Sequence, residues 1–229
     1  MKTQDSHQNA KIAAGQKAAE MIDTGMIVGL GTGSTAECFI DSLILKSKQG
    51  LRIKAVASSR ASAERAKKGG IEVEDINSVP RIDITVDGAD EIDLRKRMIK
   101  GGGGAHVREK ILACASDEMV VIVDESKLVE TVGTRKLPVE VIFFGSPATR
   151  LKIEMLGHKG KWRLNQNGTL FLTENGNLIF DISFDSPPAS PEKVHESLIR
   201  VPGVVDTGFF FNLAGRVVVG HEDGSVEIR

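Results

Sequence analysis

The stretch Met26-Ile-Val-Gly-Leu-Gly-Thr-Gly-Ser-Thr35 decides the fold class of this chain. Its apolar first half is typical of a short buried strand, and helical spacing of apolar residues resumes behind it through about Lys48. The glycines of Gly31-Thr-Gly-Ser-Thr35 allow a tight turn whose backbone amides can approach a ligand closely. A strand, a glycine turn and a helix in this order predict the start of a βαβ unit.

The same alternation of strands and helices continues along the chain. Strands are predicted at 51–57, 82–86 and 118–123, and helices at 59–68 and 106–115. This order predicts an α/β fold with a Rossmann-like parallel sheet. In such sheets the loops that leave the C-terminal ends of the strands build the ligand crevice.

The pattern changes near Thr131. A strand, a helix, a hairpin and a second helix are predicted at 137–142, 147–156, 161–184 and 192–200, closed by Val204-Val205. A β-α-β-β-α order fits a ferredoxin-like α+β domain inserted into the main fold. We therefore predict a ferredoxin-like small domain over 131–205 and a Rossmann-like catalytic domain over 1–130 plus 206–229.

The composition limits the kinds of partner that we expect the protein to bind. The 229 residues carry 30 basic and 31 acidic side chains, a net charge of −1, which argues against a nucleic-acid or membrane surface. No apolar run reaches the length of a membrane span, and residues 1–10 lack a signal-peptide core. Cys38 and Cys114 stand apart without a CxxC motif. We expect a cytoplasmic protein with no nucleic-acid partner, no membrane partner and no thiol metal site.

The loop at Gly31–Thr35 is the first candidate binding element. A helix N-terminus offers unpaired N–H groups and the positive end of the helix dipole, and Thr32, Ser34 and Thr35 add hydroxyl donors. A dinucleotide fingerprint needs glycine where Ser34 stands, and Ala57-Ser58-Ser59 occupies the place of the expected ribose-binding acid. We predict a phosphate site rather than an NAD site; the alternative is a plain turn capped by Ser34.

Four acidic residues follow the 82–86 strand within seven positions. Asp87 and Asp90 flank Gly88-Ala89, so one tight turn can present both carboxylates to sugar hydroxyls or use them for proton transfer in ring opening. For Glu91 and Asp93 we predict a solvated turn. A divalent metal is the competing use of these acids, but no histidine or amide ligand accompanies them.

A run of four glycines at 101–104 follows Lys100. Backbone amides beside one cation suit a developing oxyanion. Glu109 falls in the first turn of the next predicted helix, where it can point into the crevice or simply complement the helix dipole. We predict that His106, beside the start of that helix, is an incidental surface residue.

The ordered set of motifs is more specific than any one of them. The chain closely resembles the A-type ribose-5-phosphate isomerases in Gly31-Thr-Gly-Ser-Thr35, Asp87-Gly-Ala-Asp-Glu-Ile-Asp93, Lys100-Gly-Gly-Gly103, Arg108-Glu-Lys110, Leu137-Pro-Val-Glu-Val141, Asn175-Gly-Asn177 and Pro202-Gly-Val-Val205. The resemblance covers nearly the whole chain. It implies a Rossmann-like domain with a ferredoxin-like second domain, assembled as a homodimer or homotetramer.

The resemblance also implies roles for individual residues. Glu109 matches the catalytic base, and Asp87, Asp90 and Lys100 match residues that handle the sugar. The implied substrate-binding positions are Thr32, Gly33, Ser34, Thr35, Gly88, Ala89, Gly101, Gly102, Gly103, Lys127 and Lys11. No metal and no organic cofactor is implied, since the redox change is internal to the sugar.

The implied reaction interconverts D-ribose 5-phosphate and D-ribulose 5-phosphate through a cis-enediolate, a step of the pentose phosphate pathway. A non-catalytic sugar-phosphate sensor is the alternative. Such regulators carry a DNA-binding module, for which the segment before Met26 leaves no room. A different isomerase or an acyl-transfer enzyme on a similar fold is a second alternative.

Overall fold

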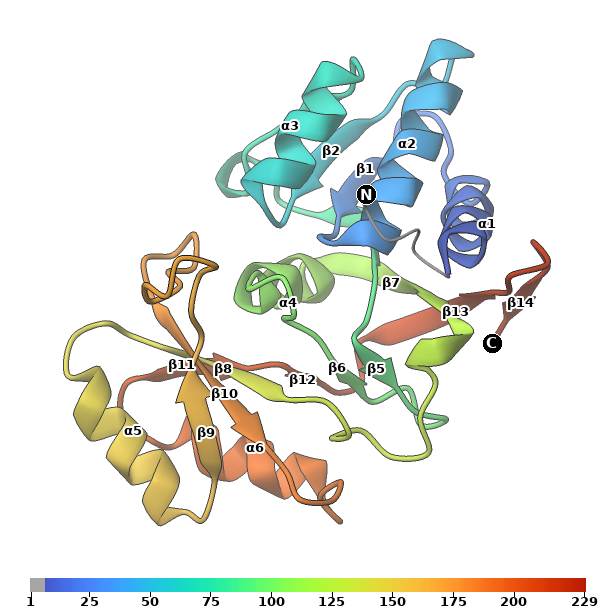
Figure 1. Ribbon diagram of the computed structural model, residues 1–229. Coiled ribbons are helices and arrows are strands. Elements are labelled where there is room, and N and C mark those ends of the chain that lie inside the picture. The colour runs from blue at the N-terminus through green and yellow to red at the C-terminus, as the bar shows by residue number, and fades with distance from the viewer. Residues whose placement is uncertain (1–6) are drawn as a thin grey trace. The chain divides into compact units, whose positions relative to one another are not determined.

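The computed structural model describes residues 7–229, and the chain divides into two compact units (Figure 1). Unit 1 comprises residues 1–89, 108–127 and 213–229, and unit 2 comprises 90–107 and 128–212. Contacts thus group 90–107 and 206–212 with unit 2, whereas the sequence analysis assigned them to the Rossmann-like domain. Within residues 7–229, none of the helices combines the length and apolarity that a membrane span requires.

Unit 1 is built on a seven-stranded sheet in the order β14-β13-β7-β4-β1-β2-β3. All neighbours are parallel except the antiparallel pair β13–β14. The six parallel strands follow the doubly wound order 3-2-1-4-5-6, whose direction reverses between β1 and β4. The predicted α/β class is confirmed. The strands are β1 (Ile27–Leu30), β2 (Lys54–Ala57), β3 (Glu72–Val73), β4 (Ile82–Asp87), β7 (Ser116–Asp124), β13 (Ala214–Gly220) and β14 (Val226–Ile228).

Helices cover both faces of this sheet. The buried cluster on one face joins strand residues such as Val28 and Val86 to helices α1, α2 and α3. On the other face, Val56 and Ile82 pack with Leu112 of α4. Gly15 lets α1 approach α2 closely, because a Cβ there would overlap with the backbone of α2. The helices are α1 (Gln8–Ala19), α2 (Ser34–Lys48), α3 (Arg60–Lys68) and α4 (His106–Cys114), with short 3-10 turns η1 (Ile76–Ser78) and η2 (Glu125–Lys127).

Unit 2 contains the predicted ferredoxin-like arrangement. Its elements follow a βαββαβ order, and its four strands lie in the order β11-β8-β10-β9 with all neighbours antiparallel. Its core includes Phe180 and Leu198. The elements are β8 (Leu137–Val141), α5 (Ser146–Met155), β9 (Lys159–Trp162), β10 (Leu178–Ser183), α6 (Pro191–Ile199) and β11 (Val204–Thr207).

A second, three-stranded sheet belongs to unit 2; a strand at 209–211 follows from the apolar run there, but the pairing of the three strands was not predicted. It has the order β12-β6-β5, with antiparallel neighbours β5 (Glu91–Ile92), β6 (Met98–Ile99) and β12 (Phe209–Phe210). Each strand has only two residues, too few to give a periodic signal. Phe209 and Phe210 are buried and anchor the sheet. Two of the candidate site residues, Asp90 and Lys100, directly flank strands β5 and β6 of this sheet.

Candidate functional site

The loop after β1 lies at the reversal of strand order in unit 1. Gly33 is the N-cap of α2, and its φ of 109° is a backbone conformation that favours glycine. Ser34 is therefore the first residue of the helix and not its cap, which corrects the alternative considered above. Gly33 and Ser34 are exposed, while Thr35 is buried. The loop thus presents the N-terminal end of a 15-residue helix at the edge where ligands of such sheets bind.

Asp87 closes this loop from the end of β4. Its side chain is fully buried, and its Oδ1 accepts the backbone N–H groups of Thr32 (3.1 Å) and Gly88 (2.7 Å). The Gly31 N–H donates to the Val86 carbonyl (3.0 Å), which continues the β1–β4 ladder into the loop. Two of the predicted elements, the glycine loop and the first aspartate, are therefore in direct contact.

Gly31→Ala should disturb Asp87, because a Cβ at this position overlaps with the buried carboxylate. We expect the free energy of unfolding to fall by about 1–3 kcal/mol, the usual cost of overpacking a core, and activity at this loop to fall with it. Gly224→Ala is the matched control: it strains a turn with φ of 84° but meets no atom within 4 Å. Urea unfolding and initial rates measure both effects. Full activity in Gly31→Ala would contradict the assigned importance of Asp87's position.

A network of hydroxyl groups holds the loop from the β2–α3 side. Thr32 Oγ1 lies 2.7 Å from Ser58 Oγ and 2.9 Å from Ser59 Oγ. Ser62 Oγ donates to the Gly31 carbonyl (2.7 Å). Ser59 also caps α3 through the Ser62 N–H (3.2 Å). The serines that replace a ribose-binding acid therefore fix the loop, a role that sequence reasoning missed.

Two lysines were predicted to bind substrate from unit 1. Lys11 is buried in α1, on the face that packs against α2, where Gln8 Nε2 lies 3.6 Å from Cys38 Sγ. Burial raises the pKa of the Cys38 thiol, while the hydrogen bond from Gln8 and the positive charge of Lys11 act in the opposite direction. Lys11 therefore lies near Cys38, the fifth residue of α2. Lys127 is half-buried at the end of η2, the turn that follows β7.

Glu109 lies in the first turn of α4 and is 3% exposed. His106, the first residue of the helix, is fully buried. The prediction of an incidental surface histidine is wrong, because its ring packs against Gly101, where a Cβ would lie 2.8 Å from Nδ1.

Asp90 and Lys100 lie at the same end of the β5–β6 ladder in unit 2. The register pairs Glu91 with Ile99, so the next positions along the two strands are Asp90 and Lys100. The Asp90 N–H donates to the Ile99 carbonyl (2.8 Å). Lys100 is 3% exposed, with its Nζ 5.6 Å from the centroid of the Phe210 ring. Two residues ten positions apart are thus brought together by a hairpin that the sequence did not reveal.

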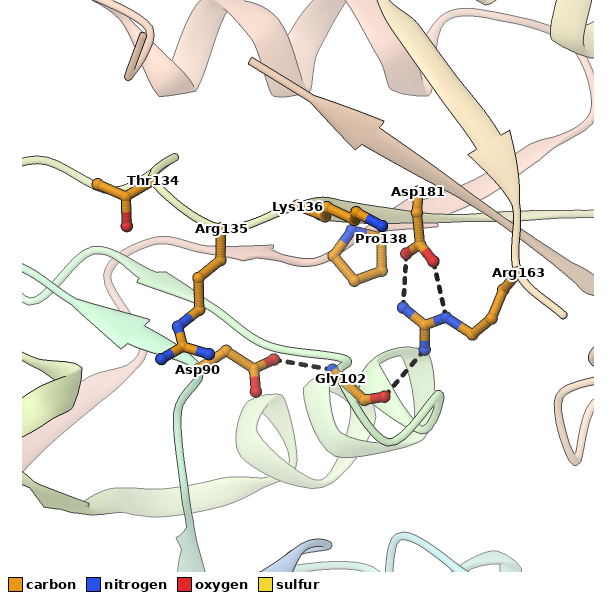
Figure 2. Close-up of a pocket in the computed structure, with 8 residues that line it drawn as sticks. All are labelled: Asp90, Gly102, Thr134, Arg135, Lys136, Pro138, Arg163 and Asp181. Atoms are coloured by element: carbon orange, nitrogen blue, oxygen red, sulfur yellow. Dashed lines mark hydrogen bonds and ion pairs between the residues drawn. The ribbon is translucent and has the colours of Figure 1, made fainter. Parts of the chain in front are cut away.

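The glycine run meets Asp90 directly. The Gly102 N–H donates to Asp90 Oδ2 (2.8 Å), and the Gly104 N–H donates to the Gly101 carbonyl (2.9 Å) in a tight turn. Gly102 and Gly103 are exposed. Figure 2 shows the adjoining cavity of unit 2, about 390 Å³, lined by Asp90, Gly102, Thr134, Arg135, Lys136, Pro138, Arg163 and Asp181.

Glu91 and Asp93 are not solvated, which corrects the prediction for both. Glu91 is fully buried, and its carboxylate accepts the N–H of Gly133 (2.6 Å), groups of Thr134 and the N–H of Arg135. Asp93 is 6% exposed and pairs with Arg97, whose Nε lies 2.6 Å from its Oδ2. Both acids are therefore structural. The partners of Glu91 lie at 133–135, beyond the acidic motif, and Arg97 directly precedes strand β6.

The remaining site predictions fall into two groups by unit. Gly88 and Ala89 are half-buried after β4 in unit 1, beside Asp87, and Thr35 Cβ lies 3.8 Å from where a Gly88 Cβ would be. Gly101 is buried in unit 2 beside Lys100. Across residues 7–229, no three His, Cys, Asp or Glu side chains gather as they would around a metal ion.

The fold and these loops define a class: a doubly wound α/β protein with a glycine loop at a helix N-terminus and a buried aspartate at the strand-order reversal. Comparison with known proteins narrows the class to one family. The model of the family ribose 5-phosphate isomerase A (phosphoriboisomerase A) matches residues 54–224. The chain belongs to this family.

Relatives and solved structures agree with that assignment. A ribose-5-phosphate isomerase A of Protochlamydia amoebophila is 46% identical over 96% of this chain and 94% of its own, and one of Parvibaculum lavamentivorans is 47% identical over 94% and 95%. The structure of ribose 5-phosphate isomerase A from Methanocaldococcus jannaschii superimposes with a TM-score of 0.91 at 31% identity, covering 97% and 99% of the two chains. A D-ribose-5-phosphate isomerase in complex with phospho-erythronic acid gives a TM-score of 0.90 at 34% identity, covering 96% of each chain.

Proposed function

We propose that this protein interconverts D-ribose 5-phosphate and D-ribulose 5-phosphate, with Glu109 as the base. Membership of the isomerase family carries the reaction class. The observation that supports a base at Glu109 is its burial in the first turn of α4. Glutamate side chains are rarely buried in proteins unless they have a specific task or partner.

Glu109 takes the proton from C2 of the open-chain aldose. The electron pair of that C–H bond forms the C1=C2 bond, and the aldehyde oxygen becomes an enediolate oxygen. Return of the carbon-bound proton to C1, movement of the C2 hydroxyl proton to O1 and formation of the C2 carbonyl give the ketose, with no electrons lost or gained overall. One carboxylate can serve both carbons because they are adjacent. Positioned general-base catalysis typically contributes ~10²–10⁴-fold.

Other residues supply charge and orientation in this proposal. Lys100 and the amides of the 101–103 run stabilise the enediolate oxygens, a contribution of ~10²–10³-fold for each donor in comparable sites. Asp87 or Asp90 assists opening of the furanose ring. The Thr32–Thr35 loop with Gly88 and Ala89 binds the substrate. Lys11 and Lys127 attract its phosphate group, and because this group lies away from the reacting carbons, binding it fixes the orientation of the sugar.

Turnover of D-ribose 5-phosphate in D₂O with EDTA present, followed by NMR, tests the function. We expect D-ribulose 5-phosphate with deuterium at C1, because a proton held on a carboxylate exchanges with solvent before it returns. A ketose formed without any deuterium would argue for direct hydride transfer instead. Binding of the sugar phosphate without turnover would favour the sensor and contradict the isomerase.

The same proposal places the protein in the cytoplasm as a homodimer or homotetramer that acts on a small sugar phosphate. Light scattering coupled to size-exclusion chromatography measures the number of subunits. A monomer that turns over the substrate at full rate would contradict the oligomer and leave the reaction untouched.

A further inference from the structure

The glycine run of unit 2 is held by an arginine that lies 61 and 62 positions away in the sequence. Arg163 Nη1 donates to the carbonyl groups of Gly101 (2.7 Å) and Gly102 (3.1 Å). Its Nε and Nη2 donate to the two carboxylate oxygens of Asp181 at 2.9 and 2.5 Å. Every nitrogen of the guanidinium fork is thus engaged in one fixed arrangement.

This arrangement sets the direction of the glycine peptides. In a trans peptide the C=O and the following N–H point in opposite directions. With the Gly101 and Gly102 carbonyls facing Arg163, the N–H groups of Gly102 and Gly103 point to the other side. The Gly102 N–H meets Asp90 there (2.8 Å), and Figure 2 shows Asp90 and Arg163 on opposite sides of Gly102.

Consecutive glycines cannot hold such a direction by themselves, because each has a wide range of accessible backbone conformations. The Arg163–Asp181 pair is well placed to restrict them, since the two side chains are only 16% and 13% exposed. The Phe171 ring adds a second restraint: it lies 5.8 Å from the Arg163 guanidinium, and a Cβ on Gly104 would overlap with it.

We propose that Arg163, paired with Asp181, is a positioning residue for the isomerisation, which holds the Gly102 amide on Asp90 and orients the Gly103 amide toward the enediolate. The inference rests on the proposed function and assigns a task in it to the ferredoxin-like part of the chain. Arg163 does not touch the reacting atoms. It acts through the glycine run.

Arg163→Met and Arg163→Lys test the proposal, with Arg150→Met as matched control. Arg150 also belongs to unit 2, pairs with Glu154 (2.8 Å) and lies over the Phe180 ring, but has no bond to the glycine run. We expect kcat to fall about 10²-fold in Arg163→Met, the size of effect that misplacement by an ångström produces. Arg163→Lys should lose nearly as much, because an ammonium lacks the planar fork. Arg150→Met should keep the parent kcat.

Binding separates positioning from a merely structural role. The affinity for phospho-erythronic acid, whose carboxylate resembles the enediolate, should fall by the same factor as kcat/KM, while KM changes by less than about threefold. The affinity for inorganic phosphate should not change. A rise in KM alone, an unchanged kcat, or undiminished affinity for phospho-erythronic acid would each overturn the proposal.

Two further measurements keep the test decisive. If Arg163→Met does not fold, Asp181→Asn retains the arginine but frees its fork, and a kcat equal to that of the parent would overturn the proposal. If the parent itself does not isomerise ribose 5-phosphate, the proposed function fails. The ¹⁵N–¹H resonances of Gly102 and Gly103 then still report orientation: they should shift in Arg163→Lys but not in Arg150→Met.

Discussion

Glu109→Gln should lower kcat for ribose 5-phosphate by ~10²–10⁴-fold. The substitution keeps the size of a side chain that is 3% exposed, so packing of the first turn of α4 is preserved. It removes the basic oxygen that takes the C2 proton. This oxygen is needed in the transition state but not for binding of the substrate. KM should therefore change little.

Initial rates over a range of substrate concentrations check this prediction. Glu64→Gln is the matched control: this acid belongs to α3 of the same unit, is exposed, and pairs with Lys68 at 3.7 Å on the helix surface. Its kcat should equal that of the parent. A fall of less than about tenfold in Glu109→Gln would be too small for loss of a general base and would transfer that role to Asp87, Asp90 or His106.

Glu91→Ala should lower the free energy of unfolding of unit 2 by about 3 kcal/mol, since a hydrogen bond to a charged group contributes ~1.5–3 kcal/mol. The carboxylate is fully buried and accepts the Gly133 N–H (2.6 Å) together with groups of Thr134 and Arg135. Alanine leaves these donors without an acceptor. The segment that leads into β8 is then no longer fixed.

Urea unfolding followed by the fluorescence of Trp162 measures the effect in this unit. Trp162 is the single tryptophan of the chain and packs edge-on against Phe180, with ring centroids 5.2 Å apart. Glu130→Ala, an exposed acid of the same unit, should stay within about 0.5 kcal/mol of the parent. A loss below about 1 kcal/mol in Glu91→Ala would mean that water replaces the carboxylate as acceptor.

The sequence predicted the architecture well where periodicity is long. The strand–turn–helix at 26–48 and the βαββα order after Thr131 both predicted the elements found, because each spans enough residues for a hydrophobic repeat. The small sheet formed by β5, β6 and β12 has strands of two residues, and its third strand comes from 209–210. No local pattern connects those positions, and for this reason the sequence alone grouped 90–107 with the Rossmann-like domain, whereas the contacts of the fold group this segment with unit 2.

Buried polar residues show the same limit at the site. Glu91 and His106 resemble surface residues in the sequence, because a motif shows composition and not what folds over it. Glu91 finds its donors 42–44 positions away, and Arg163 finds its carbonyl partners 61 and 62 positions away. A single residue such as Arg163, in a stretch with an ordinary strand pattern, has no feature in the sequence that predicts a distant contact. Glycine runs and clusters of acids are recognised from composition alone.

The hydrogen bond between Lys100 and Gly208, which directly precedes strand β12, has a consequence for biosynthesis. The Lys100 N–H donates to the Gly208 carbonyl (2.9 Å), and β6 pairs with Phe209 and Phe210. A ribosome makes Lys100 long before these partners, and closing so distant a contact is slow. A nascent chain that ends before residue 208 therefore lacks the support of its lysine and glycine run. Products of translation that stops before residue 208 therefore carry the Lys100 and glycine motifs without the contacts that hold them in the folded chain.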